Sequence, residues 1–284
     1  MPRPARRAPL IAAAVAGACG AGLARWHPVA GGDINAAMRV ELDGGRVLFV
    51  KHRPRGNFAA EAAGLRWLAE PRALPLPAPV AVDEDWLALE WIEPGRPGPG
   101  FHAALGRGLA RLHAAGADAF AGPMLVGPVA LPGDAATDWP AFYGERRLAP
   151  LVRLARDRGA LDAAGAAVLE DVIARLGGLC GPSEPPARLH GDLWSGNVMA
   201  GPAGEPWLVD PAAYAGHREV DLAMLRLFGS PPPDLLAAYE EVRPLAADHE
   251  ERVALYQLLP LLVHAVLFGG GYGASAVRAA ARYV

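Results

Sequence analysis

Hydrophobic and polar positions along the chain change their period once, near residue 93. Before that point the pattern is mostly that of strands. The segment AAMRVELDGGRVLFVK (36–51) alternates apolar and polar residues on both sides of Asp43-Gly44-Gly45, which predicts a β-hairpin that turns at the glycines. Further strands are expected over 23–29, PVAVD (79–83) and WLALEWI (86–92).

One helix interrupts these strands. The segment FAAEAAGLRWLAE (58–70) places its apolar residues at helical spacing, Asn57 stands where an N-cap belongs, and Pro71 ends the pattern. The earlier apolar run over 8–24 follows three arginines and imitates a secretory signal peptide. We expect it instead to be a helix packed on the domain, because its removal would take away the approach to the glycine turn at 31–32.

After the glycine- and proline-rich segment EPGRPGPG (93–100) the period becomes helical. Helices are predicted over HAALGRGLARLHAA (102–115), WPAFYGERRLAPLVRLARDR (139–158), LDAAGAAVLEDVIARLGGL (161–179) and ERVALYQLLPLLVHAVLFG (251–269). A loop-rich stretch over 187–214 holds two short strands, ARLH and PWLVD. The predicted fold is therefore α+β, with a small antiparallel N-lobe (1–93), a larger helical C-lobe (94–284) and a cleft between them.

Composition and charge narrow the function classes. The 284 residues are 52% hydrophobic and 20% charged, with a net charge of -3, which is typical of a globular protein. This balance provides no general attraction to nucleic acid or an anionic membrane, so neither is expected as a partner. Two cysteines, Cys19 and Cys180, do not make a disulfide framework, and a reducing, cytoplasmic location is expected.

Almost all of the basic residues are arginine: 26 are Arg and only one, Lys51, is Lys. A compact ammonium on a flexible stem performs tasks that a planar guanidinium does not. Lys51 ends the predicted strand VLFVK, and Glu61 follows on the next helix. Together they resemble the ion pair of protein kinases, in which the lysine contacts the α- and β-phosphates.

The strongest chemical signal is HGDLWSGN (190–197), followed by Asp210 after a short strand. Phosphoryl transfer needs a carboxylate that orients the attacking hydroxyl and oxygen ligands that hold Mg²⁺. Asp192 is suited to be the base, and Asn197 and Asp210 to bind the metal. The segment Gly31-Gly32-Asp33-Ile34-Asn35, between two predicted strands, is suited to cover phosphates with backbone N–H groups, or is a simple hairpin turn.

These motifs resemble those of the fructosamine kinase (ketosamine-3-kinase) family, in the aminoglycoside-phosphotransferase and choline-kinase branch of the protein-kinase-like fold. The resemblance covers about residues 15–280. Its most specific stretches are RLHGDLWSGNV, LVDPAAYAGHREVDLAMLRLFG and LLVHAVLFGGGY, with support from FYGERRLAPLV and FVKHRPRGNFAAEAAGLRWL.

The resemblance implies a two-lobe kinase that uses ATP and Mg²⁺ to phosphorylate the 3-hydroxyl of ketosamines, which serves protein deglycation. It implies Asp192 as base, Asn197 and Asp210 as metal ligands, and Lys51 with Glu61 at the phosphates. Residues implied at the nucleotide are Gly31, Gly32, Asp33, Asn35 and the hinge formed by Glu90, Trp91 and Ile92. A related phosphotransferase for aminoglycoside or choline-like acceptors, or an inactive nucleotide-binding module, are the alternatives.

Four residues near the motifs have less defined expectations. Trp194 is expected either to stack on the substrate or to pack internally, and His217 and Glu219 are candidates for the substrate pocket. Asp221 is expected to tie down the catalytic loop by hydrogen bonds. The preferred sugar, the free or protein-bound state of the amine and the oligomeric state stay open at this point.

Overall fold

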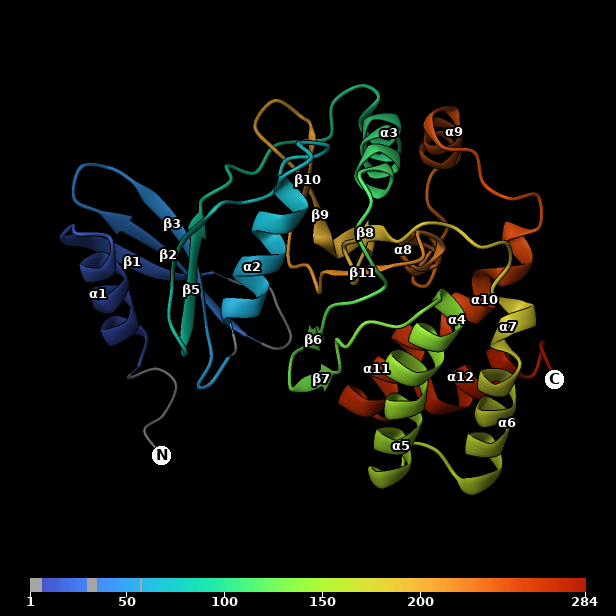
Figure 1. The fold of residues 1–284 in the computed structure, drawn as a ribbon. Coiled ribbons are helices and arrows are strands. Elements are labelled where there is room, and N and C mark those ends of the chain that lie inside the picture. The colour runs from blue at the N-terminus through green and yellow to red at the C-terminus, as the bar shows by residue number, and fades with distance from the viewer. Residues whose placement is uncertain (1–6, 30–34, 57) are drawn as a thin grey trace.

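The computed structural model describes residues 7–29, 35–56 and 58–284, which form two lobes (Figure 1). The N-lobe is a five-stranded antiparallel sheet in the order β1-β2-β3-β5-β4. Its strands are β1 (Leu23–Val29), β2 (Ala36–Leu42), β3 (Val47–His52), β4 (Pro79–Val82) and β5 (Trp86–Glu90). The predicted strands are thereby confirmed.

Two helices cover opposite faces of this sheet. Helix α1 (Ala8–Ala18) packs on Met38, Val40 and the other side chains of one face. Helix α2 (Phe58–Ala69) packs on the other face, where its contacts include the side chains of Phe49 and Leu87. Because successive side chains of a strand alternate, Lys51 shares the α2 face with Phe49. The expected N-terminal helix is confirmed, whereas the Asn57 cap lies outside the described residues.

The turn between β2 and β3 follows from its glycines. Gly44 and Gly45 have φ of 89° and 86°, a backbone conformation that side-chain-bearing residues rarely adopt. The predicted hairpin turn at these two residues is therefore confirmed.

The C-lobe is mainly helical. Its longer helices are α3 (Phe101–Ala114), α5 (Ala149–Asp157), α6 (Ala163–Ala174), α9 (Pro233–Val242), α11 (Leu258–Phe268) and α12 (Tyr272–Ala280). The shorter ones are α4 (Trp139–Phe142), the π-helix η2 (Tyr143–Leu148), α7 (Leu176–Leu179), the 3₁₀-helix η3 (Ser195–Asn197), α8 (Glu219–Leu225), the 3₁₀-helix η4 (His249–Arg252) and α10 (Val253–Tyr256).

Three two-stranded ribbons complete this lobe. They are β6 (Met124–Val126) with β7 (Val129–Leu131), β8 (Ala187–Leu189) with β11 (Tyr214–Gly216), and β9 (Val198–Ala200) with β10 (Pro206–Leu208). Strands β6, β7, β9 and β11 and helices α8, α9 and α12 were not among the sequence predictions. Strands of three residues are too short to show a period.

The helix expected over 139–158 is divided by the π-helix η2. Pro150 has no N–H to donate to the carbonyl of Arg146, four residues earlier. The Arg147 Nη1 donates to that carbonyl instead, at 3.0 Å. A side chain therefore replaces the missing backbone donor where the helix widens.

The connection from β5 to α3 is fastened to the C-lobe. The N–H of Gly95 donates to the Ala200 carbonyl at 2.9 Å, and that of Gly98 to the Gly204 carbonyl at 3.0 Å. A Cβ on Gly95 would lie 1.9 Å from the Gly201 carbonyl oxygen. Only glycine permits this close approach, so residues 93–100 form a fixed connection against the β9–β10 turn.

The expectation that His217 and Glu219 line the substrate pocket is wrong. His217 is buried in the C-lobe core, where its ring lies 5.3 Å from that of Tyr256 and 6.0 Å from that of Trp139. Glu219 accepts two hydrogen bonds from the Arg252 guanidinium, at 2.8 and 2.9 Å. Both side chains point inward, because aromatic rings surround His217 and the guanidinium partner of Glu219 lies inside the lobe.

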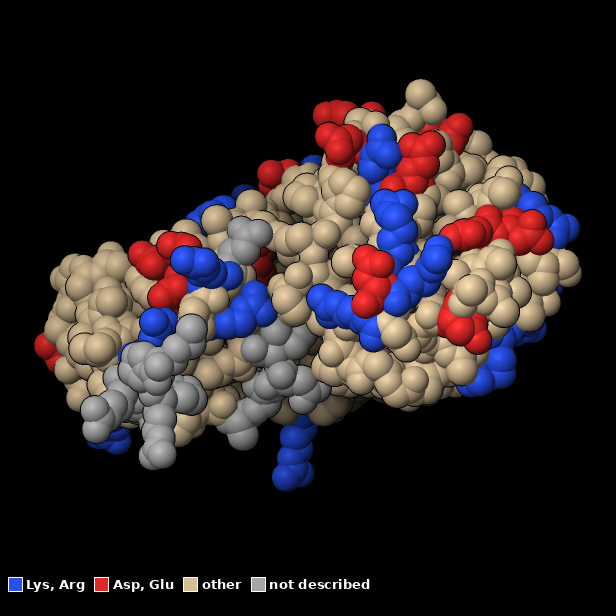
Figure 2. Space-filling model, turned by 90° about the horizontal axis from the view of Figure 1, so that it is seen from below, with Lys and Arg blue, Asp and Glu red and all other residues tan. Residues whose placement is uncertain are grey.

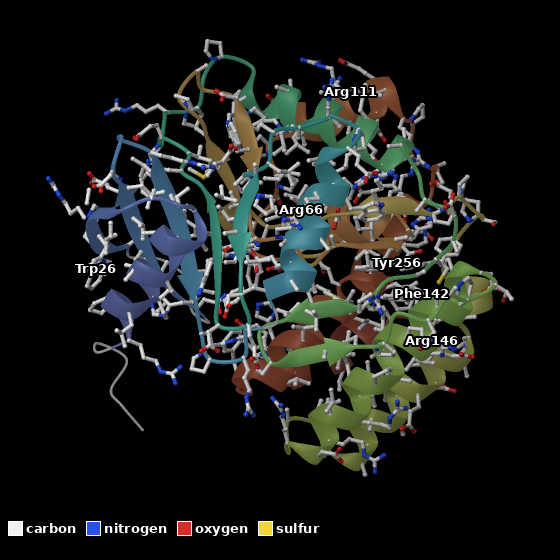
Figure 3. The ribbon with its side chains drawn as sticks, turned by 60° about the vertical axis from the view of Figure 1, so that its left-hand side comes forward. Trp26, Arg66, Arg111, Phe142, Arg146 and Tyr256 are labelled. Atoms are coloured by element: carbon white, nitrogen blue, oxygen red, sulfur yellow. The ribbon has the colours of Figure 1, made fainter. Side chains whose placement is uncertain are left out.

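The surface and one apolar helix bear on the expected partners. On the face shown in Figure 2, basic and acidic side chains are interspersed. In the described part of the chain, the stretch His249–Phe268 is long and apolar enough to cross a membrane, but 67% of it is buried inside the lobe. The stretch includes Tyr256. Figure 3 shows Tyr256 and Phe142 in the C-lobe, whereas Trp26 lies in the N-lobe on the edge strand β1. The stretch consists of η4, α10 and α11, most of which is buried in the C-lobe core.

We predict that Gly106→Ala destabilises the protein by about 1–3 kcal/mol, although alanine favours helices more than glycine. A Cβ at this position of α3 would lie 2.0 Å from the Leu235 carbonyl oxygen of α9, so the two helices would have to separate. Denaturant unfolding measures the change. Gly17→Ala is the control, because nothing lies within 4 Å of its Cβ and the substitution should be neutral or stabilising. Equal effects of the two substitutions would contradict the packing account.

We predict that His217 makes the protein less stable as the pH falls below 6.5. Burial lowers the pKa of His217 from 6.5 to about 4, so between these values the unfolded chain binds a proton that the folded chain does not. Stability is therefore lost as the pH falls through this window. Between pH 7.5 and 5.0 the protein should lose about 2 kcal/mol more than His217→Phe, which keeps an aromatic ring but cannot be protonated. Parallel losses in denaturant unfolding at the two pH values would refute this account.

Candidate active site

A cleft of about 1060 Å³ lies where the two lobes meet. From the N-lobe it is lined by side chains of β2, β3, α2 and the segment that joins β3 to α2. From the C-lobe it is lined by the β6–β7 hairpin, the loop 191–197, residues 210–213 and side chains of α8, α11 and α12. The polar groups that it gathers are Asn35, Lys51, Arg53, Glu61, Asp192, Trp194, Asn197, Asp210, His264 and Tyr272.

Lys51 joins the two lobes at this cleft. Its Nζ lies 2.6 Å from Glu61 Oε1 of α2 and 2.6 Å from Asp210 Oδ1 of the C-lobe. The residue is only 4% exposed. Burial by itself lowers the pKa of Lys51, but the two carboxylates outweigh it and hold the pKa above its usual value. The ammonium is therefore charged at neutral pH and fixed in place.

The loop that follows β8 has a backbone that only glycine permits. Gly191 has φ of 81°, and a Cβ there would lie 2.1 Å from the Ala212 carbonyl oxygen. His190 supports this loop from beneath, because its Nε2 donates to the Val209 carbonyl at 2.9 Å and its Nδ1 accepts from the Asp192 N–H at 3.3 Å. One neutral tautomer satisfies both contacts, so His190 serves as a structural residue.

Asp221 ties the same loop to α8, as expected. Its carboxylate accepts from the N–H groups of His190 at 2.7 Å and Gly191 at 2.9 Å. It also lies 3.3 Å from His113 Nε2, whose Nδ1 contacts the Tyr239 hydroxyl at 2.9 Å. Asp221 and His113 are both fully buried, so the loop rests on a polar network shielded from water.

Asp192 and Asn197 meet within this loop. The Asn197 Nδ2 donates to the Asp192 carbonyl oxygen at 2.8 Å and to its Oδ2 at 3.0 Å. The 3₁₀-helix η3 makes this approach possible by folding the five-residue spacing back on itself. Burial raises the pKa of the Asp192 carboxyl, although His190 and Asn197 act against this shift. Asp192 is thus an oriented carboxylate facing the cleft.

Asp210 presents a partly exposed carboxylate to the cleft, where it could bind a metal ion. It follows β10 with φ of 57°, a left-handed conformation unusual for aspartate, and its side chain is 45% exposed. Lys51 occupies Oδ1, which leaves Oδ2 available. No group of three or more His, Cys, Asp or Glu side chains suited to a metal occurs among the described residues. Mg²⁺ does not need one, since it is held by one or two carboxylates together with phosphate oxygens and water.

The other residues predicted for the nucleotide divide into three groups. Gly31, Gly32 and Asp33 lie outside the described residues. Asn35 lines the cleft, and its Oδ1 is buried without a hydrogen-bond partner among the described residues. Glu90, Trp91 and Ile92 do not line the cleft, although Trp91 packs against the cleft residue Phe49 with ring centroids 6.5 Å apart.

Trp194 lines the cleft and is 37% exposed, with its ring edge-to-face to Phe228 at 5.7 Å. The sequence analysis did not predict the aromatic cluster around His264 in the same cleft. Phe228, Phe268 and Tyr272 surround His264, with ring centroids 5.0 to 5.5 Å from it, and all line the cleft. The four-residue spacing of His264 and Phe268 on an otherwise apolar helix was the available signal.

Known proteins share this arrangement. The family model described as fructosamine kinase matches residues 10–284. A Thermus thermophilus protein assigned as a ketoamine kinase is 40% identical over 248 residues, which is 86% of this chain and 88% of its own. The chloroplastic protein-ribulosamine 3-kinase of Arabidopsis thaliana is 34% identical over 263 residues, covering 88% of this chain and 79% of its own.

Solved structures agree with these relatives. The crystal structure of a Thermobifida fusca protein assigned as a fructosamine-3-kinase superposes with a TM-score of 0.89 at 40% identity, over 96% of this chain and 97% of that one. An aminoglycoside phosphotransferase solved with ADP has a TM-score of 0.61 at 13% identity over 92% of this chain and 95% of that one. The second likeness shows the protein-kinase-like fold alone. With its fold, its motifs and these relatives in agreement, the chain belongs to the fructosamine kinase family and is a phosphotransferase for ketosamine hydroxyl groups.

Proposed function

We propose that the protein transfers the γ-phosphoryl group of ATP to the sugar 3-hydroxyl of a ketosamine, with Asp192 as the general base. The observation that carries this proposal is the double ion pair of Lys51. It brings a phosphate-binding ammonium and a candidate metal ligand, Asp210, together in the cleft that Asp192 faces.

The nucleotide would lie between the N-lobe and the loop 191–197. Its phosphates would meet Lys51, and its adenine would lie toward Glu90, Trp91 and Ile92. The unpartnered Oδ1 of Asn35 adds a hydrogen-bond acceptor at the same side of the cleft. Glu61 would keep the Lys51 ammonium in position while Asp210 turns to other ligands.

Mg²⁺ is the expected cofactor, and the donors present fit it. Asp210 has one carboxylate oxygen free of Lys51, and Asn197 has an amide oxygen, since only its Nδ2 is used to hold Asp192. When bound, the ion would neutralise charge on the phosphates during transfer. Asn197 would then have two tasks, because its amide nitrogen positions the base and its oxygen reaches the metal.

Asp192 would accept the proton of the attacking hydroxyl. Its position is set twice, by Asn197 on the side chain and by Asp221 beneath the preceding backbone. A raised pKa brings the carboxyl nearer to the working pH, which favours proton transfer. The hydroxyl is thereby oriented toward the phosphate held at Lys51.

The acceptor would be a ketosamine, free or carried on a protein, and the product would serve deglycation in the cytoplasm. An aminoglycoside or choline-like acceptor is the alternative enzyme substrate. An inactive nucleotide-binding module is disfavoured, because Lys51, Asp192 and Asp210 line one cleft together.

One experiment tests the substrate and the position. The protein is incubated with ATP, Mg²⁺ and a panel of ketosamines, an aminoglycoside and choline, and the phosphate is located by NMR. Phosphate on the 3-hydroxyl of a ketosamine is expected. Turnover of only the aminoglycoside or choline, or binding of ATP without turnover, would overturn the proposal.

Asp192→Asn should lower kcat by about 10²–10⁴-fold, the usual contribution of general acid–base catalysis. Asparagine keeps an oxygen that accepts from Asn197 but does not take the proton, so ATP binding and the melting temperature should stay near those of the parent. Steady-state kinetics, ATP titration and a melting curve check this. Asp171→Asn, on an exposed position of α6, is the control. Activity of Asp192→Asn within threefold of the parent would remove Asp192 from the role of base.

Lys51→Arg should lower kcat/KM for ATP by about 10²-fold although it keeps the charge. The guanidinium is wider and planar, and it does not fit between carboxylates that both lie 2.6 Å from one nitrogen. A shift of about 1 Å in such a complex has an effect of this size. Arg46→Lys, at an exposed turn, exchanges the same residue types as a control. Full activity of a stable Lys51→Arg protein would contradict the phosphate role.

A further inference from the structure

The β6–β7 hairpin presents one face to the C-lobe core and the other to the cleft. The register pairs Met124 with Leu131 and Leu125 with Ala130. Met124, Leu125 and Val126 all line the cleft, but Met124 and Val126 also pack with Leu131 on the C-lobe core, whereas the half-buried Leu125 does not. Because side chains alternate along a strand, Leu125 is the residue of β6 whose side chain faces away from the core, so its contact in this part of the cleft is not also a core contact.

The hairpin lies at the end of the lobe boundary opposite the 93–100 connection (Figure 1). Arg53, just after β3, reaches across to it, and its Nη2 donates to the Gly127 carbonyl at 3.3 Å and to the Gly56 carbonyl at 3.0 Å. Since the adenine is proposed to lie toward residues 90–92, the acceptor has the space between Asp192 and this hairpin.

The other C-lobe side chains around this space are mainly apolar and aromatic. Phe228, Leu267, Phe268 and Tyr272 contribute to it, and Phe228 and Phe268 are 49% and 50% exposed. The carboxylates among the described cleft residues are Glu61, Asp192 and Asp210, which the ion pair and the catalytic loop already use. A group that extends past the reacting sugar would therefore meet mainly carbon atoms.

Arg147 fixes both ends of the hairpin. It is fully buried in the π-helix η2, and its Nη1 donates to the Pro132 carbonyl at 2.7 Å while its Nη2 donates to the Gly122 carbonyl at 2.6 Å. Gly122 lies before β6 and Pro132 lies after β7, so one guanidinium joins the two ends of the hairpin. The guanidinium carbon also lies 4.4 Å from the ring of Phe142 and 4.2 Å from that of Tyr214. No carboxylate pairs with Arg147 in the described structure, so its charge serves the hairpin and the two rings.

We propose that the β6–β7 hairpin is a specificity wall that contacts the substituent on the ketosamine nitrogen and favours an aliphatic one. Leu125 is the contact residue and Arg147 is a positioning residue that acts through the hairpin backbone. The proposal rests on ketosamine phosphorylation as the function, and it adds which part of the acceptor the cleft distinguishes.

The test uses two ketosamines with the same fructose part, one made from methylamine and one from n-hexylamine. The parent protein should have the higher kcat/KM for the hexyl compound. Leu125→Ala should lower kcat/KM for the hexyl compound about tenfold, the effect of removing an apolar contact from a pocket. It should leave the methyl compound within threefold and KM for ATP unchanged.

Leu10→Ala is the matched control, because Leu10 is 73% exposed on α1 in the other lobe. Arg147→Lys should repeat the pattern of Leu125→Ala, since an ammonium does not reach both carbonyls at once. If Arg147→Lys does not fold, Leu125→Ala alone decides, because Leu125 is outside the buried core. If Leu125→Ala changes kcat/KM equally for both compounds, or for neither, the proposal that the hairpin sets specificity is wrong. A parent protein that is inactive on every ketosamine would instead overturn the proposed function.

Discussion

The salt bridges of Lys51 are the interaction on which the site depends. One nitrogen, almost excluded from water, is shared between Glu61 of the N-lobe and Asp210 of the C-lobe. A buried ammonium is unfavourable without partners, and two carboxylates without it would repel each other. The three groups therefore stabilise one another only when α2, β3 and the segment after β10 have their native arrangement. The charged ammonium that we propose for phosphate binding is thereby fixed only in the folded, two-lobe molecule.

The loop 190–197 is held by a second polar arrangement, which is formed by Asp221, His113 and Tyr239. Asp221 satisfies two backbone N–H groups in a place that water does not reach, and His113 and Tyr239 extend the network into α3 and α9. Groups of this kind are costly to leave unpaired, so the loop has one favoured conformation. The close packing of Gly106 in α3 against α9 supports the same region from behind. Stability of the C-lobe and orientation of Asp192 thus have a common origin.

Hydrogen bonds to backbone carbonyls lie at both ends of the boundary between the lobes. At one end Gly95 and Gly98 pair with the β9–β10 turn, and at the other Arg53 meets the hairpin that Arg147 supports. Each contact uses carbonyl groups rather than side-chain acids, so these contacts need not change when the phosphates arrive. This arrangement is consistent with a site in which the reacting groups are positioned before the substrate binds.

The sequence by itself determined the parts whose geometry is local. Alternation predicted the strands, Gly44 and Gly45 predicted the turn, and the five-residue spacing of Asp192 and Asn197 brought carboxylate and amide together on one short loop. Only the tertiary structure decided what depends on contacts distant along the chain. His217 and Glu219 stand beside the motif yet point into the core, because Tyr256 and Arg252 lie there. Leu125 lines the cleft in a hairpin whose two ends meet at Arg147, and a three-residue strand carries no pattern from which this could be read.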